Sequence, residues 1–286
     1  MAFVKKNIRQ ILAAYGSGTP YHPGKWRIVE GVAGFCNLQS LEPTVDVVRA
    51  GVTWRLNIRG LVERSVYYLG VYEIHETRWL RQQVQPGWVA CDVGANFGYY
   101  ANLLALWAGR DAAIYAFEPS SGLFQTLSTN RELNKFTQLY PQHAAVDETI
   151  GVIQLELPPE GNQGLGRICD KGVKREGLRY EDVQTVTLDT FADEQGFERL
   201  DFIKIDVEGS EMRVLSGAEA LIRRFKPKMM IEINPPSLEG FGASGPELLQ
   251  KIRDLGYSVY VLKGSQLTPL EAGDIKDYVN AICLPG

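Results

Sequence analysis

Four residues near the middle of the chain have the types and the spacing of a nucleotide-binding corner. In WVACDVGANFGYY, residues 88–100, a short apolar run ends in Asp92, and Gly94 and Gly98 follow. This pattern predicts a strand that turns tightly into a helix, where glycines let a ligand approach the backbone and the first helical turn has free N–H groups. Glu118 ends the next apolar run, 24 residues after Gly94. An acid there can accept hydrogen bonds from both hydroxyls of a ribose.

The same corner lacks what a dinucleotide needs. The middle glycine of a G-x-G-x-x-G fingerprint is missing from DVGANFG. An acid two residues before the first glycine is a poor neighbour for a pyrophosphate, but it suits a cation. A ligand with a ribose, a cationic amine and no phosphate is S-adenosylmethionine, which we therefore expect as the cofactor.

The carboxyl ends of two later strands supply the acids that a transfer reaction would use. Asp206 ends the fourth expected strand and is the first candidate for a general base, with Glu208 two residues further on. Glu232 lies in the apolar run MMIEINPP, where an unpaired carboxylate would be costly, so we expect it to meet Lys204, a substrate hydroxyl or a metal. Asn234 ends that strand and could bind a sugar hydroxyl.

Other polar residues are weaker candidates. His75 is a possible alternative base, and Asn162 and Arg167 in a glycine-rich loop could contact the acceptor. Asp206, Glu232 and Asn234 could also form an oxygen-ligand site for Mg²⁺. Glu211, in the first turn of a helix, has a structural interpretation.

These residues need a parallel sheet to bring them together, and the pattern from about residue 86 predicts one. Apolar runs alternate with helical patterns, which indicates a doubly wound, Rossmann-like α/β sheet of seven strands. About 14 residues without a helical period join the last two strands, so we expect an antiparallel final strand. Strands are expected at 88–93, 112–118, 138–146, 200–207, 228–234, 257–262 and 277–284, and helices at 97–108, 119–134, 210–225 and 244–255.

The chain divides into a cap and a main domain. Residues 86–286 form the expected cofactor-binding domain, with an insertion at 147–199 in which 151–157 and 183–188 alternate and could pair. Residues 1–85 predict an amphipathic helix, a hairpin and further helices, which together form an N-terminal cap.

Charge and cysteine content narrow the range of possible functions further. Residues 1–85 carry 11 Lys and Arg against 6 Asp and Glu, whereas the remainder carries 19 against 28. A basic segment of this kind either docks on the acidic domain or meets a phosphate-bearing substrate or a membrane surface. The net charge of −4 and the lack of a basic–aromatic stripe argue against nucleic acid. Four scattered cysteines, no signal peptide and no membrane span predict a cytoplasmic protein.

Several segments together resemble the FkbM-type methyltransferases, S-adenosylmethionine-dependent enzymes that mostly methylate hydroxyls of sugars and polyketides. The most specific segment is IKIDVEGSEMRVLSGAEALI, residues 203–222. The others are YYLGVYEIHETRWL at 67–80, DVGANFGYY at 92–100, AFEPSSGLFQTLSTNRELN at 116–134 and TLDTF at 187–191. The resemblance covers about 45–262.

The resemblance implies a role for each matching position. Tyr72 and Glu73 would lie near the amino-acid end of the cofactor, with Asp206 beside its methyl group. The methionine half would be held by Asp92, Gly94, Asn96 and Gly98, the ribose by Glu118 with Pro119, and the adenine would border Ala145.

The sequence thus predicts an O-methyltransferase for a hydroxyl of a sugar or of a glycosylated or polyketide natural product. An N-methyltransferase acting on a small molecule, a nucleotide-dependent oxidoreductase and an inactive cofactor-binding scaffold are the alternatives. The expected partner is a small-molecule or saccharide acceptor. The oligomeric state is not predicted.

Overall fold

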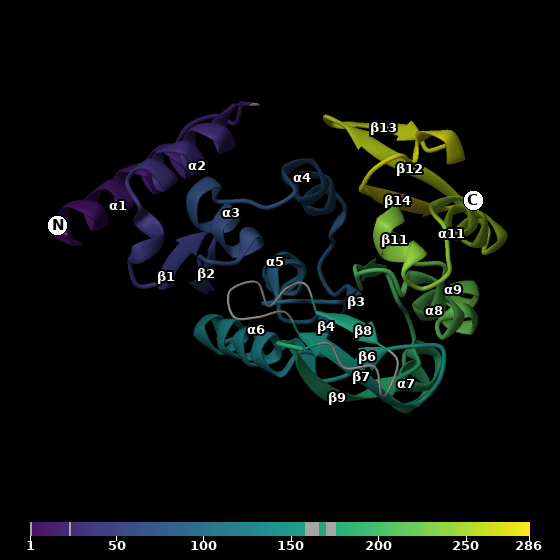
Figure 1. The fold of residues 1–286 in the computed structure, drawn as a ribbon. Helices are drawn as coiled ribbons and strands as arrows, with labels where there is room; N and C mark the ends of the chain where they lie inside the picture. Colours follow the sequence, from purple (N-terminus) through teal and green to yellow (C-terminus); the bar gives the residue numbers. More distant parts are fainter. Residues whose placement is uncertain (1, 23, 158–165, 170–175) are drawn as a thin grey trace.

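The predicted strands assemble into one mixed sheet in a computed structural model, which describes residues 2–22, 24–157, 166–169 and 176–286 (Figure 1). The strand order is β13-β12-β14-β11-β10-β3-β4-β5. Strands β3, β4, β5, β10 and β11 run parallel, whereas β14 is antiparallel to both β11 and β12. The strands are β3 (Val89–Val93), β4 (Ala113–Phe117), β5 (Leu139–Gln142), β10 (Phe202–Ile205), β11 (Lys228–Ile233), β12 (Tyr257–Lys263), β13 (Gln266–Pro269) and β14 (Val279–Pro285).

The doubly wound sheet with a reversed last strand is therefore confirmed, and β13 extends the seven predicted strands to eight. Alternate residues of the central strands enter two different hydrophobic clusters, as expected for a sheet buried on both faces. Ala90 belongs to one cluster and Cys91 to the other. The flanking helices are α5 (Tyr99–Ala108), α6 (Ser121–Asn134), α8 (Glu211–Ser216), α9 (Glu219–Phe225), α10 (Pro235–Glu239) and α11 (Gly245–Asp254), with the short turn η3 (Ala272–Asp274) before β14.

The single helix predicted at 210–225 is wrong, because α8 and α9 are separate helices. They part at Gly217, where an added Cβ would lie 2.1 Å from the carbonyl oxygen of Asp147. The loop after the third strand therefore packs directly against the backbone between the two helices.

The insertion forms a second, four-stranded sheet of order β6-β9-β7-β8. The predicted antiparallel pairing of 151–157 with 183–188 is confirmed for residues 183–186, but the second strand begins earlier, at Arg179, and Leu188 already belongs to a helix. The predicted strand at 138–146 is split, because β5 stays in the main sheet while β6 joins the insertion. The elements are β6 (Ala145–Val146), β7 (Gly151–Leu157), β8 (Arg167–Cys169), β9 (Arg179–Val186) and the following helix α7 (Leu188–Glu194).

Among the described residues of the segment 1–85, which we call the cap, the buried hydrophobic side chains all join the cluster on one face of the main sheet. Trp54 is fully buried, and its ring lies 5.8 Å from that of Phe97. Asn134 and Asn130 of α6 accept hydrogen bonds from the backbone of β2 at 2.8 and 2.7 Å. The cap comprises α1 (Ala2–Gly18), α2 (Lys25–Phe35), η1 (Leu38–Ser40), β1 (Thr44–Arg49), β2 (Val52–Asn57), α3 (Leu61–Leu69) and α4 (Ile74–Gln83).

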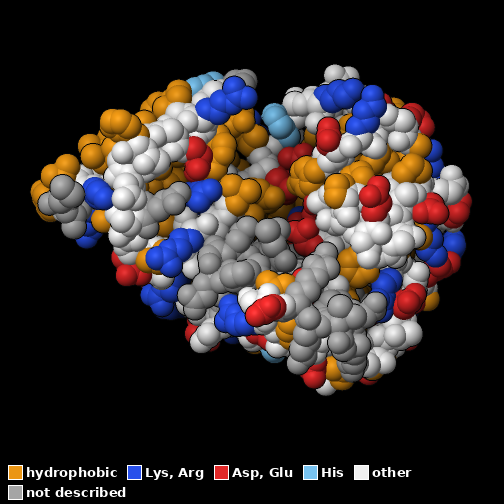
Figure 2. Space-filling view, in the orientation of Figure 1, with side chains coloured by type: hydrophobic (Ala, Val, Ile, Leu, Met, Phe, Trp, Pro, Cys, Tyr) orange, Lys and Arg blue, Asp and Glu red, His pale blue; other side chains and the backbone are white. Residues whose placement is uncertain are grey.

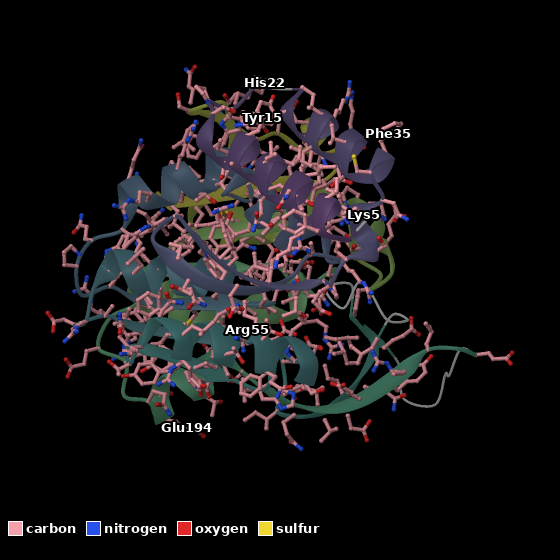
Figure 3. All side chains as sticks on the ribbon, turned by 90° about the vertical axis from the view of Figure 1, so that its left-hand side faces the viewer. Lys5, Tyr15, His22, Phe35, Arg55 and Glu194 are labelled. Atoms are coloured by element: carbon pink, nitrogen blue, oxygen red, sulfur yellow. The ribbon has the colours of Figure 1, made fainter. Side chains whose placement is uncertain are left out.

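Polar contacts hold the outer helices of the cap together. Lys5 donates to Ser40 Oγ at 2.9 Å, and Tyr15 Oη lies 3.1 Å from His22 Nε2 at the upper end of α1 (Figure 3). Within the described part of the chain, no helix is long and apolar enough to cross a membrane.

Candidate active site

The predicted site residues meet at a cavity of about 240 Å³ on the carboxyl edge of the main sheet. Its walls come from the ends of β3, β4, β10 and β11, from the cap and from the insertion. The predicted residues that line it are Tyr72, Asp92, Gly94, Asn96, Glu118, Pro119, Ala145, Asp206, Glu208 and Glu232.

Glycine is required at positions 94 and 98 for different structural reasons. Gly94 has a φ of +81°, and a Cβ on it would lie 1.8 Å from the carbonyl oxygen of Asp206, so β3 and β10 leave no room for a side chain. Gly98 has a φ of +89° at the start of α5, where a Cβ would meet Leu127 at 2.4 Å. Gly98 is not among the residues that line the cavity, so its role is to pack the helix start rather than to contact a ligand.

Asp92 is a buried carboxylate that faces the cavity without a hydrogen-bond partner. Its side chain belongs to a residue only 1% exposed, and neither oxygen accepts a hydrogen bond of normal geometry among the described residues. Burial raises the pKa of Asp92 to about 6, although the ammonium group of Lys204 and, more weakly, the N–H of Ala101 act in the opposite direction. An anion left unpaired in this way fits a cationic ligand group.

The carboxylate of Glu118 connects the loop after β3 with the loop after β4. Its Oε2 accepts from the N–H of Asn96 and its Oε1 from the N–H of Ser120, both at 2.8 Å. Burial raises the pKa of Glu118 to about 7. Each oxygen retains a second lone pair, so the carboxylate can still accept two ligand hydroxyls. The adjacent wall is apolar and is formed by Leu123, Ala144, Ala145, Val146, Leu155 and Ile168.

The opposite end of the cavity holds a lysine and two coupled carboxyl groups. Lys204 Nζ donates to Asp206 Oδ2 at 2.6 Å and lies 5.0 Å from the centre of the Tyr100 ring. Burial raises the pKa of Glu232 strongly, and its hydrogen bond with Asp206 adds to the rise. Burial acts upwards on Asp206 too, but Lys204 and Glu232 hold its pKa below the usual value. The directions of these two pKa shifts favour a proton on Glu232 and an ionised Asp206.

Of the three partners predicted for Glu232, Lys204 is ion-paired with Asp206 instead, and Glu232 hydrogen-bonds Asp206. A substrate hydroxyl and a metal remain predictions. Asn234, half-buried at the end of β11, donates to Glu232 Oε1 at 3.4 Å. The described residues contain no group of three or more His, Cys, Asp or Glu side chains that could hold a metal ion.

The loop after β10 presents Glu208 to the cavity. Glu208 has a φ of +54°, and burial followed by the charges of Asp206 and Glu211 raises its pKa to about 7. Glu211 points back into the loop, where it accepts from the N–H groups of Val207 at 3.3 Å and Gly209 at 3.0 Å. The structural interpretation of Glu211 is therefore confirmed.

Glu73 does not line the cavity but lies behind residues that do, so it is not placed beside the expected ligand. Its carboxylate accepts hydrogen bonds from Tyr100 Oη at 2.5 Å, from Asn280 Nδ2 at 2.7 Å and from Tyr278 Oη. Tyr100 and Tyr278 line the cavity, so Glu73 acts on it through these two hydroxyls and through its charge, which, against the effect of burial, helps to raise the pKa of Lys204. The sequence analysis missed Tyr278 and Asn280, which carry no motif and come close to Glu73 only through the reversed strand β14.

Three further predicted residues do not add to the described cavity. His75 is half-buried in α4 and is not among the lining residues. Asn162 lies outside the described residues. For Arg167 only the backbone is described, and it pairs with Glu156 across β8 and β7.

Comparison with known proteins gives a consistent family. A family model described as a methyltransferase FkbM domain matches residues 92–259. The chain is 30% identical over 162 residues to the 31-O-demethyl-FK506 methyltransferase FkbM of Streptomyces tacrolimicus, covering 48% of this chain and 62% of that protein. It is 26% identical over 140 residues to the hexuronic acid methyltransferase AglP of Haloferax volcanii, covering 49% and 54%. The chain thus spans less than two thirds of the length of these two relatives.

A solved structure extends over more of the chain. The methyltransferase FkbM of Methylobacillus flagellatus aligns with 98% of this chain and 59% of its own, with a TM-score of 0.43 and 16% identity.

Proposed function

Since the chain belongs to the FkbM methyltransferase family, we propose that it is an S-adenosylmethionine-dependent O-methyltransferase that acts on a hydroxyl of a sugar or of a glycosylated or polyketide natural product. The observation that carries the proposal is the presence, in one cavity, of the buried and unpartnered carboxyl group of Asp92 and of Asp206, whose Oδ2 lies 2.6 Å from Lys204 Nζ. The first suits a cationic cofactor, and the second suits a hydroxyl acceptor. The names of the relatives, an O-methylating and a hexuronic acid methyltransferase, favour the same acceptor class.

The cofactor end of the cavity has the donors and acceptors that S-adenosylmethionine needs. Asp92 would bind its ammonium group, Glu118 would accept its two ribose hydroxyls, and the apolar wall around Ala145 would hold its adenine. When bound, S-adenosylmethionine supplies a methyl group whose bond to sulfur breaks as a bond to the acceptor oxygen forms, leaving S-adenosylhomocysteine. Holding the acceptor oxygen in line with that bond contributes up to about 7–11 kcal/mol.

The other end of the cavity would handle the proton of the acceptor. Asp206 is the general base, because Lys204 keeps it ionised and its side chain lines the cavity. The hydroxyl proton passes to Asp206 as the carbon–oxygen bond forms, a contribution of about 10²–10⁴-fold in rate. Glu232, already protonated, can donate a hydrogen bond that orients the acceptor, and Glu208 is the alternative base.

Titration of the purified protein with S-adenosylmethionine, NAD⁺ and NADP⁺ tests the cofactor assignment. We expect the methyl donor alone to bind, and Asp92→Ala to weaken its binding at least about tenfold through loss of the ionic partner. A response to a nicotinamide cofactor with silence from the methyl donor would overturn the proposal. Transfer of a radiolabelled methyl group to a panel of alcohols and amines then separates O- from N-methylation.

A further inference from the structure

A second hollow, of about 450 Å³, lies beside the first cavity, and the side chain of Tyr278 belongs to the walls of both. On the basis of the proposed function, we propose that this second hollow binds the acceptor, and that it selects a polyhydroxylated acceptor that is neutral or cationic, not one that carries a carboxylate. We call it the acceptor groove. Its lining residues are Glu73, Glu76, Val261, Leu262, Lys263, Pro269, Leu270, Asp274, Tyr278, Val279 and Asn280.

The topology of the sheet puts the groove on the same edge as the cavity. Because β14 is antiparallel to β11, it begins where β11 ends, and β12 ends there too. Asn280 is the register partner of Glu232, so the two side chains stand next to each other across the β11–β14 ladder. Figure 2 shows the surface hollowed between the cap and the C-terminal strands, with acidic side chains gathered along the hollow. The groove therefore adjoins the cavity that Asp206 and Glu232 line.

Asn280 supplies a specific sign of a missing ligand. The residue is 7% exposed, and its Nδ2 donates to Glu73 Oε1 and to Tyr278 Oη, both at 2.7 Å. Its Oδ1 is buried and has no hydrogen-bond partner among the described residues. A buried carbonyl oxygen without a donor costs about 1–3 kcal/mol. A hydroxyl or ammonium group of an acceptor would satisfy it, whereas a carboxylate has no proton to offer.

The charge of the groove also favours a neutral or cationic acceptor over one that carries a carboxylate. Its walls carry the acids Glu73, Glu76 and Asp274 against one base, Lys263. Glu76 is half-buried, and burial together with the neighbouring charge of Glu73 raises its pKa. A like charge placed in such a groove is repelled at low local dielectric, whereas hydroxyls and ammonium groups find acceptors. This differs from the acceptor named for the AglP relative, a hexuronic acid.

Tyr278 stands where the groove meets the cavity. Its hydroxyl donates to Glu73 and also hydrogen-bonds Tyr72, which lines the cavity. Tyr278 is nonetheless 45% exposed, and it lines both the groove and the cavity. An acceptor that contacts Tyr278 in the groove would therefore also lie next to the cavity that Asp206 lines.

Three matched probes test the groove: methyl glucoside, which is neutral, methyl glucosaminide, which is cationic, and methyl glucuronide, which is anionic. Binding of each is followed by saturation-transfer NMR with S-adenosylhomocysteine present, and methyl transfer by a radiolabelled donor. We expect the neutral and cationic probes to bind and to accept a methyl group, and the glucuronide to be weaker by about tenfold or more.

Charge reversal in the groove sharpens the test. Glu76→Lys should shift the ratio of glucuronide to glucosaminide binding by about tenfold towards the glucuronide. Glu132→Lys is the matched control, because Glu132 is an exposed acid on α6 that lines neither hollow. It should leave the ratio unchanged.

The remaining outcomes are decisive as well. Preference of the wild type for the glucuronide, an unchanged ratio in Glu76→Lys, or silence from all three probes would overturn the acceptor groove. If S-adenosylmethionine still binds in that case, the proposed function survives and only this inference fails. If S-adenosylmethionine does not bind, the proposed function itself has failed.

Discussion

The cofactor end and the acceptor end of the carboxyl edge are built in different ways. At the cofactor end, side chains bond the backbone of neighbouring loops, as in the contact of Asn96 N–H with Glu118, 22 positions apart. At the acceptor end, side chains bond one another over long distances in the chain, as in Asn280 with Glu73, 207 positions apart. The first arrangement is fixed once β3 and β4 pair. The second depends on three strands and the cap meeting correctly, so small changes in any of them alter it.

Gly94→Ala should have the largest effect, because Gly94 is where the two ends touch. A Cβ would lie 1.8 Å from the carbonyl oxygen of Asp206, and φ is +81°. We expect a loss of more than about 4 kcal/mol of unfolding free energy in urea titration. Gly196→Ala is the control, since Gly196 has a φ of +66° with nothing within 4 Å of the added Cβ. It should lose only about 1–2 kcal/mol. Equal losses of unfolding free energy in the two variants would show that backbone strain, and not the close contact with Asp206, makes glycine necessary at position 94.

Asp92→Asn should separate stability from function at the cofactor end. Burial raises the pKa of Asp92 in the folded protein to about 6, above its ordinary value of 3.8. The folded state therefore binds the proton more tightly, so stability is greatest below the unfolded pKa and falls as pH rises through the folded one. Near pH 7 the substitution should stabilise the free protein by up to about 3 kcal/mol, with little gain near pH 4. The same substitution should weaken S-adenosylmethionine binding. A pH-independent difference in urea midpoints would contradict this account.

Lys204→Met should damage the acceptor end. Lys204 holds down the pKa of Asp206, so without it the carboxyl group is protonated to a higher pH. We expect kcat at neutral pH to fall about 100-fold, and the acidic limb of its pH profile to move upwards. Lys228→Met is the control, because Lys228 begins β11 at the opposite edge of the sheet and donates to Gln83 Oε1 at 2.7 Å. An unshifted pH profile in Lys204→Met would remove Asp206 as the base.

Of these substitutions, Glu73→Gln should have the smallest effect, and the effect should be limited to the acceptor end. The amide keeps an acceptor for Tyr100 or Tyr278 but loses the charge that holds both hydroxyls and Asn280. We expect kcat/KM for the acceptor to fall about fivefold, with an unchanged Kd for S-adenosylmethionine. Tyr278→Phe removes one of the same bonds and should act in the same direction. A weaker Kd for the cofactor would show that the two ends are not separable at Glu73.

The contrast also explains what could be predicted from the sequence. The cofactor corner was predictable because Asp92, Gly94 and Glu118 are local features of a strand–turn–helix and of the next strand. The partner of Glu232 was not, because Asp206 and Lys204 both lie in reach and only the geometry decides between them. Tyr278 and Asn280 carry no signal of their own, since strand reversal brings them to the site. His75 was chosen for its neighbours in sequence, but α4 does not place it on the cavity wall.

The same reasoning applies to the fold. The apolar runs of the buried strands and their spacing predicted the sheet, because burial on both faces leaves few other arrangements. The splitting of 138–146 into β5 and β6 and the break at Gly217 follow from close contacts between distant segments, which no local pattern reports. Strand β13 is short and partly polar, and it forms only by pairing with β12.

The two ends of the chain segment that forms the insertion sheet lie next to each other. The N–H of Asp147 donates to the carbonyl of Val186 at 2.9 Å, and the sheet packs around a small cluster of Ala145, Leu155, Leu157 and Val183. Leu155 nevertheless reaches the cavity wall. A segment whose ends meet can be lengthened, shortened or exchanged by recombination without displacing a strand of the main sheet. A change in the length of this insertion should therefore alter the shape of the cavity wall while Asp206 and Glu232 stay in place.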